Sequence, residues 1–230
     1  MKGGVLVERI PKPASTVILL DQENRVYLTK RPQTMKFLGG FFVFPGGAVE
    51  REDAEIHHDF IRNHKSYNAF SPGHYIAAAR ELFEEVGVLL ATRVDGSFAA
   101  LAPQTERAYR QQLLNGEISF IEILHQEKLF FDFNHLTYFG HRVTPKQSPI
   151  RFDTRFFLAK LPHNQTPKPD EHEIDEALWV TPQEGLAANQ EGKMLLAPPT
   201  VDSLQTILNH HNGGELMLGM QQQREFPFEP

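Results

Sequence analysis

The chain has 230 residues, of which 40% are hydrophobic, with no cysteine and a formal net charge of −6. This composition is typical of a globular protein, and the lack of cysteine excludes disulfides, cysteine nucleophiles and thiolate zinc sites. The acidic balance argues against non-specific nucleic-acid binding, and no apolar run approaches the roughly 18 residues of a membrane-spanning helix. We therefore expect a cytoplasmic protein with neither nucleic-acid nor membrane partners.

The first quarter of the chain is predicted to form mainly strands. Residues 16–20 and 25–30 are separated by a polar turn, which predicts a β-hairpin. The apolar and aromatic stretch 39–44 predicts another strand, which ends at a tight glycine turn over residues 45–47. The polar stretch 54–70 is expected to include a short helix.

The clearest helix signal covers residues 71–86. Ser71 can cap the helix, and Pro72 suits the first helical position. Gly87 is suited to the left-handed conformation that commonly ends a helix. We therefore predict a helix of about four turns that stops at Gly87.

The remainder of the chain mixes both kinds of element. Helices are predicted at 105–115 and 119–128, after Thr181, and from Pro198 to about residue 210; strands are predicted at 136–143, 155–161 and 177–180, with a polar loop at 165–175. No repeat or linker separates these elements. The pattern predicts one α+β domain over residues 1–230.

Three carboxylates share one face of the predicted helix 71–86. The spacings i, i+3 and i+4 place Glu81, Glu84 and Glu85 together, apart from an apolar stripe that is expected to enter the core (Ile76, Ala79, Leu82, Phe83 and Val86). Like charges at these spacings repel, and the helix dipole disfavours anions in the last turn. A divalent cation with oxygen ligands, Mg²⁺ or Mn²⁺, would remove the conflict. The alternative is a solvated acidic face.

The segment around these glutamates resembles a family signature. Arg80-Glu81-Leu82-Phe83-Glu84-Glu85-Val86-Gly87-Val88 matches the second half of the Nudix box at every defined position. Gly47, in Phe44-Pro45-Gly46-Gly47, matches the first glycine of the box, and Asp53 stands where the box has its first glutamate. The gap from Asp53 to Arg80 is 26 residues rather than seven, an insertion of 19. The chain thus resembles a Nudix hydrolase with an interrupted box.

The interruption resembles the coenzyme A diphosphatase branch of that family. Leu28-Thr29, Gly40 and Phe44-Pro45-Gly46-Gly47 keep the register of a coenzyme A signature that precedes the box. Lys36 takes the arginine position of that signature, and Arg31-Pro32 replaces Thr-Ser. This partial match favours coenzyme A or acyl-CoA as substrate.

The resemblance extends over about residues 15–186, and the segment 151–157 also resembles the same branch. It implies the Nudix fold, an α+β arrangement with a mixed sheet between helices. On this interpretation residues 54–72 are an insertion within the box, residues 95–135 a helical decoration, and residues 198–230 a C-terminal helix and tail.

The resemblance also implies an activity. Nudix hydrolases cleave a diphosphate bond in a small nucleotide-containing substrate, with Mg²⁺ or Mn²⁺ as cofactor. Glu81, Glu84 and Glu85 would hold the metal, with Glu84 and Glu85 also in the catalytic set and Arg80 holding one of these carboxylates. The pair Gly46-Gly47 would let the backbone pass close to the metal.

Further candidate site residues lie outside the box. Glu171 and Glu173, in the polar loop before the strand 177–180, are candidates for the general base; a solvated acidic loop is the alternative. Arg31 and Lys36 are candidates to meet substrate phosphates, and ordinary surface cations are the alternative.

Two other functions stay open from the sequence. The same chemistry could act on ADP-ribose, NADH or a dinucleoside polyphosphate, or the domain could be a non-catalytic nucleotide sensor. The intact carboxylates, and the lack of a visible basic helix-turn-helix segment, argue against the sensor. A homodimer is also left open.

Overall fold

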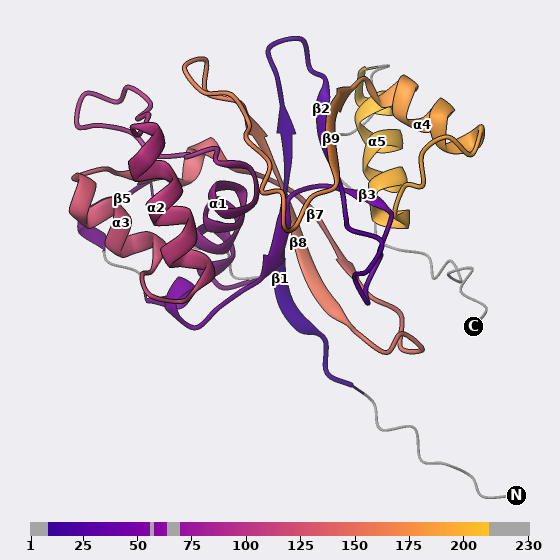
Figure 1. Ribbon diagram of the computed structural model, residues 1–230, viewed down its shortest axis with the longest axis horizontal. Coiled ribbons are helices and arrows are strands. Elements are labelled where there is room, and N and C mark those ends of the chain that lie inside the picture. Colours follow the sequence, from indigo (N-terminus) through magenta and orange to yellow (C-terminus); the bar gives the residue numbers. More distant parts are fainter. Residues whose placement is uncertain (1–8, 56–57, 64–69, 212–230) are drawn as a thin grey trace, which may run out of the picture.

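The computed structural model describes residues 9–55, 58–63 and 70–211. A mixed sheet with the strand order β3-β2-β1-β8-β7 forms its centre, and β4 and β9 add to β1 and β2 (Figure 1). The strands are β1 (Lys12–Leu20), β2 (Val26–Lys30), β3 (Phe42–Val43), β4 (Gly46–Ala48), β7 (Thr137–Val143), β8 (Phe152–Lys160) and β9 (Glu176–Val180). β1 lies parallel to β8 and antiparallel to β2 and β4.

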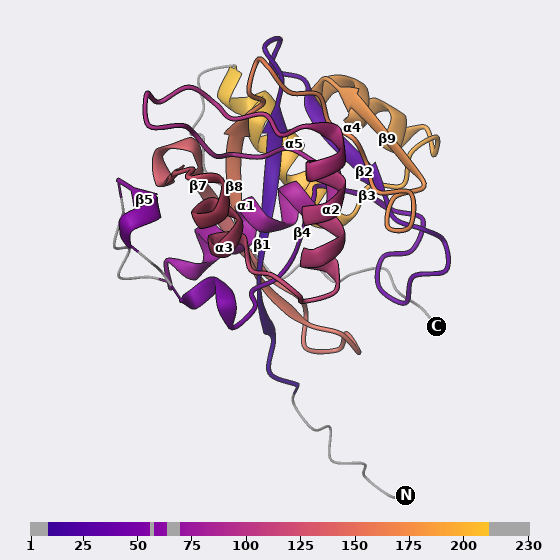
Figure 2. The ribbon, with the colours of Figure 1, turned by 60° about the vertical axis from the view of Figure 1, so that its left-hand side comes forward.

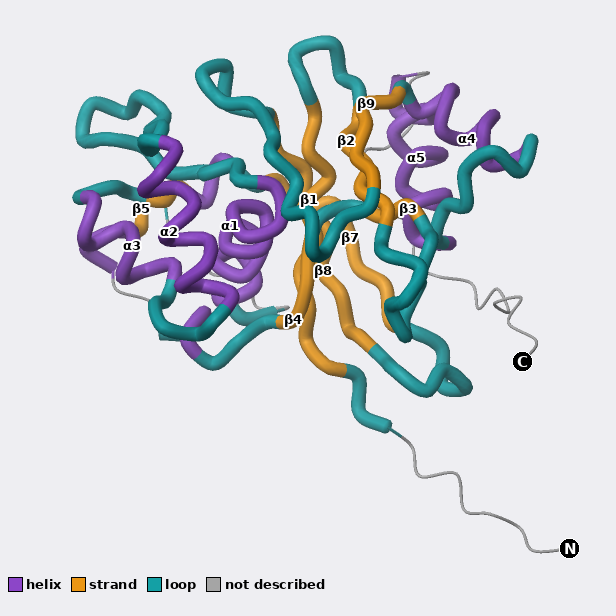
Figure 3. Tube along the Cα trace, in the orientation of Figure 1, coloured by secondary structure: helices purple, strands orange, loops and turns teal. Residues whose placement is uncertain are grey.

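Helices cover the sheet on both sides. One group comprises α1 (Gly73–Val86), α2 (Pro103–Leu114) and α3 (Phe120–Glu127); the other comprises α4 (Pro182–Gln190) and α5 (Pro198–His211). Figure 3 shows the strands between these two groups of helices. Helix α1 contacts β1 and β4, and it also lies beside them in the turned view of Figure 2. The predicted α+β architecture, a mixed sheet sandwiched between helices, is confirmed.

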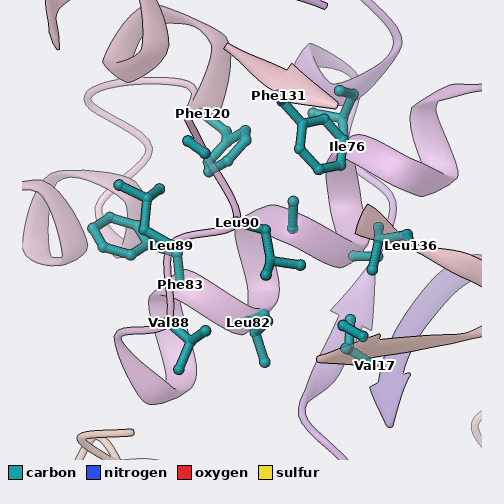
Figure 4. Packing of buried hydrophobic residues seen from close by; sticks show 14 of the residues in the cluster. Val17, Ile76, Leu82, Phe83, Val88, Leu89, Leu90, Phe120, Phe131 and Leu136 are labelled. Carbon is teal, nitrogen blue, oxygen red and sulfur yellow. The ribbon is translucent and has the colours of Figure 1, made fainter. Parts of the chain in front are cut away.

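The two faces of the sheet have separate apolar cores. Leu82 and Phe83 of α1 pack with Val17 of β1 and with Phe120 and Phe131 of the 95–135 region (Figure 4). On the opposite face, side chains of β2, β3 and β8 pack against α5. The helix that carries the three glutamates is thus held between the sheet and the decoration.

The glycine turn expected at residues 45–47 is wrong. Gly46–Ala48 forms strand β4, which pairs antiparallel with Ala14–Thr16 of β1. Gly46 adopts a φ of 156°, and a Cβ there would lie 2.4 Å from the Ser15 carbonyl oxygen. Because glycine has no Cβ, the backbone can continue flush against β1 instead of turning away.

The helix predicted at 71–86 is present and begins two residues later, at Gly73. Pro72 is the N-cap rather than the first helical residue, and the Gly73 amide donates to Ser71 Oγ over 3.2 Å. Gly87 ends the helix with a φ of 69°, as predicted. The ranges predicted for the other helices and for the strands of the second half agree with the structure to within a few residues.

The insertion within the box contributes short elements. The 3₁₀ turn Glu52–Ala54 leads into it, and it forms the 3₁₀ turn His58–Phe60 and strand β5 (Ile61–Arg62), which pairs parallel with β6 (Phe131–Asp132) of the decoration. A third 3₁₀ turn, Phe133–His135, follows β6. Part of the insertion and the predicted C-terminal tail lie outside the described residues. Within the described ranges, no helix has the length and apolar character needed to cross a bilayer.

Candidate active site

Arg80 is the centre of the acidic face of α1. Its Nε and one Nη donate to the two carboxylate oxygens of Asp53 over 3.0 Å each, and the same Nη donates to the Ala48 carbonyl over 2.8 Å. Its other Nη donates to Glu81 and Glu84, both over 3.0 Å. These bonds use all five N–H groups of a guanidinium. With 4% of its side chain exposed, Arg80 orients neighbouring carboxylates rather than facing solvent.

Strand β4 brings the backbone against the same carboxylates. The Gly46 amide donates to Glu85 Oε2 over 3.2 Å. A Cβ on Gly47 would lie only 2.4 Å from Glu81 Oε1. Gly46 thus supplies an amide to Glu85, and Gly47 leaves room for the Glu81 carboxylate. That the pair lets the backbone pass close to a metal stays a prediction.

The carboxylates are buried rather than solvated. The side chains of Glu81 and Glu84 are 12% and 8% exposed, and Glu85 is half-buried. Burial raises the pKa of Glu81 to about 8 and that of Glu84 to about 7, although Arg80 opposes both shifts. Burial, together with the charge of Glu81, also raises the pKa of Glu85. The alternative of a solvated acidic face does not fit this environment.

The three glutamates do not already surround one point. Among the described residues, no three carboxylate or imidazole groups have an arrangement that would hold a metal ion. Glu81 and Glu84 turn toward Arg80, while Glu85 turns toward Gly46. That these three glutamates are the metal ligands stays a prediction, and a shared ion would require side chains to turn away from these bonds.

The structure separates the two candidates for a general base. Glu171 is exposed, whereas Glu173 is half-buried and interacts electrostatically with the glutamates of α1. Burial and the neighbouring Asp170 raise the pKa of Glu173, while Arg31 lowers it. The amide of Asp170 donates to the Glu85 carbonyl over 2.8 Å, which ties this loop to the end of α1.

The two candidate phosphate partners also differ. Arg31 is half-buried, its Nε donates to the Phe37 carbonyl over 3.1 Å, and its charge lowers the pKa of both Glu85 and Glu173. Lys36, on the same loop, is exposed. The structure therefore brings Arg31, but not Lys36, into the field of the carboxylates.

Sequence reasoning missed one basic residue at this site. Arg110 of α2 is 8% exposed and donates to the backbone carbonyls of Glu84 and Glu85. It belongs to the decoration, to which no role was assigned, and its partners are backbone atoms 25 and 26 residues away. No local spacing pattern reports such a contact.

The sequence is similar to known proteins. The NUDT19 Nudix domain family matches residues 60–207. Putative nudix hydrolase 7 of Caenorhabditis elegans is 30% identical over 191 residues, which cover 83% of this chain and 58% of that protein. The acyl-coenzyme A diphosphatase NUDT19 of Xenopus laevis is 26% identical over 223 residues, covering 77% of this chain and 58% of that protein. The chain thus matches little more than half the length of these relatives.

A solved structure is also similar over nearly the whole chain. The crystal structure of a NUDIX hydrolase from Alicyclobacillus acidocaldarius superposes with a TM-score of 0.78 at 31% sequence identity. The match covers 91% of this chain and 98% of that one. At this identity, coverage and TM-score, the two chains share one fold.

Proposed function

Because this chain belongs to the Nudix hydrolase family, with a Nudix domain of the NUDT19 type, we propose that it hydrolyses a diphosphate bond in a nucleotide-containing substrate. One observation carries the proposal: Glu81, Glu84 and the half-buried Glu85 are largely withdrawn from solvent on one face of α1, where Glu81 and Glu85 meet the glycines of β4. Buried carboxylates that outnumber their cations are costly for a fold, so their presence calls for a positively charged ligand.

The residues present fit a divalent cation. Glu81, Glu84 and Glu85 offer carboxylate oxygens, the donors that Mg²⁺ and Mn²⁺ prefer, and burial, with a smaller contribution from neighbouring glutamates, raises the pKa of all three. When bound, such a cation neutralises phosphoryl oxygens and lowers the pKa of a coordinated water. Ligation by these three glutamates is part of our proposal.

The other residues of the site would accept a proton, bind a substrate phosphate or position the glutamates. Glu173 is our candidate base, because it is half-buried beside the glutamates of α1, and burial and Asp170 raise its pKa, which makes its carboxylate a stronger proton acceptor. Arg31, which lies in the field of the same carboxylates, would hold a substrate phosphate by charge. Arg80 has no donor left for substrate and would act by positioning Glu81 and Glu84.

For the substrate, we propose coenzyme A or acyl-CoA, cleaved to adenosine 3′,5′-bisphosphate and a 4′-phosphopantetheine product. Two observations support this choice. The segment from Leu28 to Gly47 partly matches a coenzyme A signature, and the Xenopus laevis relative is an acyl-coenzyme A diphosphatase. The alternatives are ADP-ribose, NADH or a dinucleoside polyphosphate and, outside catalysis, a nucleotide-sensing domain.

Product analysis by mass tests the proposal. The chain is incubated with coenzyme A and Mg²⁺ beside Glu84→Gln, Glu85→Gln and the exposed-loop control Glu171→Gln. We expect phosphopantetheine release by wild type and by Glu171→Gln, and loss of release in the two α1 variants. Cleavage of ADP-ribose or NADH but not of coenzyme A would overturn the substrate. Binding without cleavage of any diphosphate would support the sensor.

A further inference from the structure

The last four carbonyls of α1 all have partners, and only one of these partners comes from α1's own cap. Carbonyl groups at a helix C-terminus have no intrahelical partner and need one from elsewhere. The Phe83 carbonyl accepts from the Gly87 amide, and the Val86 carbonyl accepts from the Lys168 amide over 2.7 Å. The carbonyls between them, those of Glu84 and Glu85, accept from Arg110.

Arg110 reaches both carbonyls with one planar group. Its Nε donates to the Glu84 carbonyl over 2.9 Å, and its Nη2 donates to the Glu85 carbonyl over 3.1 Å. The Glu85 carbonyl also accepts from the Asp170 amide over 2.8 Å. Arg110 and the loop that carries Glu173 therefore meet at a single peptide group of α1.

A second connection joins the same elements through side chains. Glu106, one turn before Arg110 on α2, forms an ion pair with Arg110 Nη1 at 3.8 Å and another with Lys168. Glu106 and Arg110 are both buried, at 6% and 8% exposure. A Cβ on Gly87 would lie 2.9 Å from Glu106 Oε1 and 3.2 Å from Arg110 Nη1, so α2 packs directly on the end of α1.

We propose that Arg110 is a positioning residue: by bonding the Glu84 and Glu85 carbonyls, it fixes the register between the last turn of α1 and the loop that carries Glu173. This inference rests on the proposed function, and it gives the 95–135 decoration a role in that site. A guanidinium suits the position because its fork spans two carbonyls, and because a cation is favoured at a helix C-terminus.

Two variants of Arg110 separate the effect of its hydrogen bonds from the effect of its charge. Arg110→Met removes both the bonds and the charge, whereas Arg110→Lys keeps the charge without the fork. Arg107→Met is the matched control, because Arg107 is exposed on the same helix, where its Nε donates to the Pro103 carbonyl. Each protein is tested as the full chain, with circular dichroism and thermal unfolding to show that it is folded.

The first readout needs neither substrate nor metal. Hydrogen exchange of the Lys168 and Asp170 amides should be faster in Arg110→Met, while amides of β1 and β8 exchange as in wild type. Faster exchange throughout the chain would mean that Arg110 only stabilises the fold. That result would overturn the proposal.

The second readout is Mn²⁺ affinity, followed by the electron paramagnetic resonance of the free ion. Loss of a residue that orients metal ligands weakens binding by about 10–100-fold, and we expect this for Arg110→Met, with a smaller loss for Arg110→Lys. Charge alone predicts the opposite sign, because removing a cation beside carboxylates would tighten Mn²⁺ binding. Tighter or unchanged binding by the Met variant would overturn the proposal, and if that variant does not fold, unchanged binding by the Lys variant would do so.

Steady-state kinetics on the substrate found for wild type complete the test. We expect kcat to fall by about 10–100-fold with little change in KM, and Arg107→Met to match wild type. If wild type binds Mn²⁺ but cleaves no diphosphate, only the proposed function fails. The exchange and Mn²⁺ measurements would still decide the role of Arg110.

Discussion

Raising the pH should destabilise the metal-free protein. Burial raises the pKa of Glu81 to about 8 and that of Glu84 to about 7, above the 4.5 of an exposed glutamate. The folded state therefore keeps protons that the unfolded state has released. By linkage, the stability that these groups contribute is complete below pH 4.5 and is lost as the pH rises through 7 and 8.

The size of the effect follows from these pKa values. Between about pH 7 and pH 8.5, Glu81 and Glu84 together should cost about 1–2 kcal/mol of unfolding free energy. For a domain of this size, that corresponds to a fall in Tm of about 2–8 °C. Burial lowers the pKa of His74, His135 and His141, so these residues add stability as pH rises, but mostly below the ordinary histidine value of 6.5.

The assay is thermal unfolding across this pH range, with a chelator or with saturating MgCl₂. Because a metal requires ionised carboxylates, added Mg²⁺ should raise Tm more at the alkaline end than at neutral pH. Glu81→Gln should remove most of the fall in the metal-free profile and Glu84→Gln a smaller part, whereas Glu171→Gln, at an exposed position, should leave it unchanged. A metal-free Tm that stays level or rises above neutral pH in wild type would refute the assignment of buried, proton-holding carboxylates.

Three further substitutions test separate parts of the site. Gly47→Ala places a Cβ 2.4 Å from a carboxylate oxygen of α1, so kcat should fall by about 10²-fold in steady-state assays, and normal turnover would contradict the close contact. Asp53→Asn removes the buried charge that pairs with Arg80 and should cost on the order of 3 kcal/mol in urea unfolding; a cost near zero would show that Ala48 and the remaining glutamates suffice. Glu173→Gln should lower kcat by about 10²–10⁴-fold with KM unchanged, and the proposed base is wrong if this variant is as active as wild type.

The local patterns in the sequence predicted α1 well. Its apolar stripe, the three glutamates and the stop at Gly87 all depend on a period of 3.6 residues and on one backbone conformation, and both are local properties. The role of Gly46 and Gly47 was harder to predict. A glycine pair after an aromatic strand most often marks a turn, and only pairing with β1 shows that here it continues as strand β4.

Contacts between segments that are distant in the chain could not be predicted from the sequence. Glu171 and Glu173 stand two residues apart in a polar loop, and nothing local distinguishes them. The bond from the Asp170 amide to the Glu85 carbonyl holds this loop to α1 and leaves Glu173 half-buried beside the glutamates. Arg110 was missed for a similar reason, because its partners are backbone carbonyls of another helix.

The same geometry explains how the box tolerates its interruption. Gly73, the first residue of α1, lies against Asp53, since a Cβ there would be 3.1 Å from the Asp53 carbonyl oxygen, and the Asp53 side chain binds Arg80. The chain therefore leaves and rejoins the box at nearly one place, and closing the intervening loop adds little entropy cost. The insertion in turn packs on the decoration, where β5 pairs with β6 and Ile61 joins the apolar core around Phe131. Because the decoration also carries Arg110, the insertion is connected through it to the C-terminal end of α1, the helix that follows the insertion.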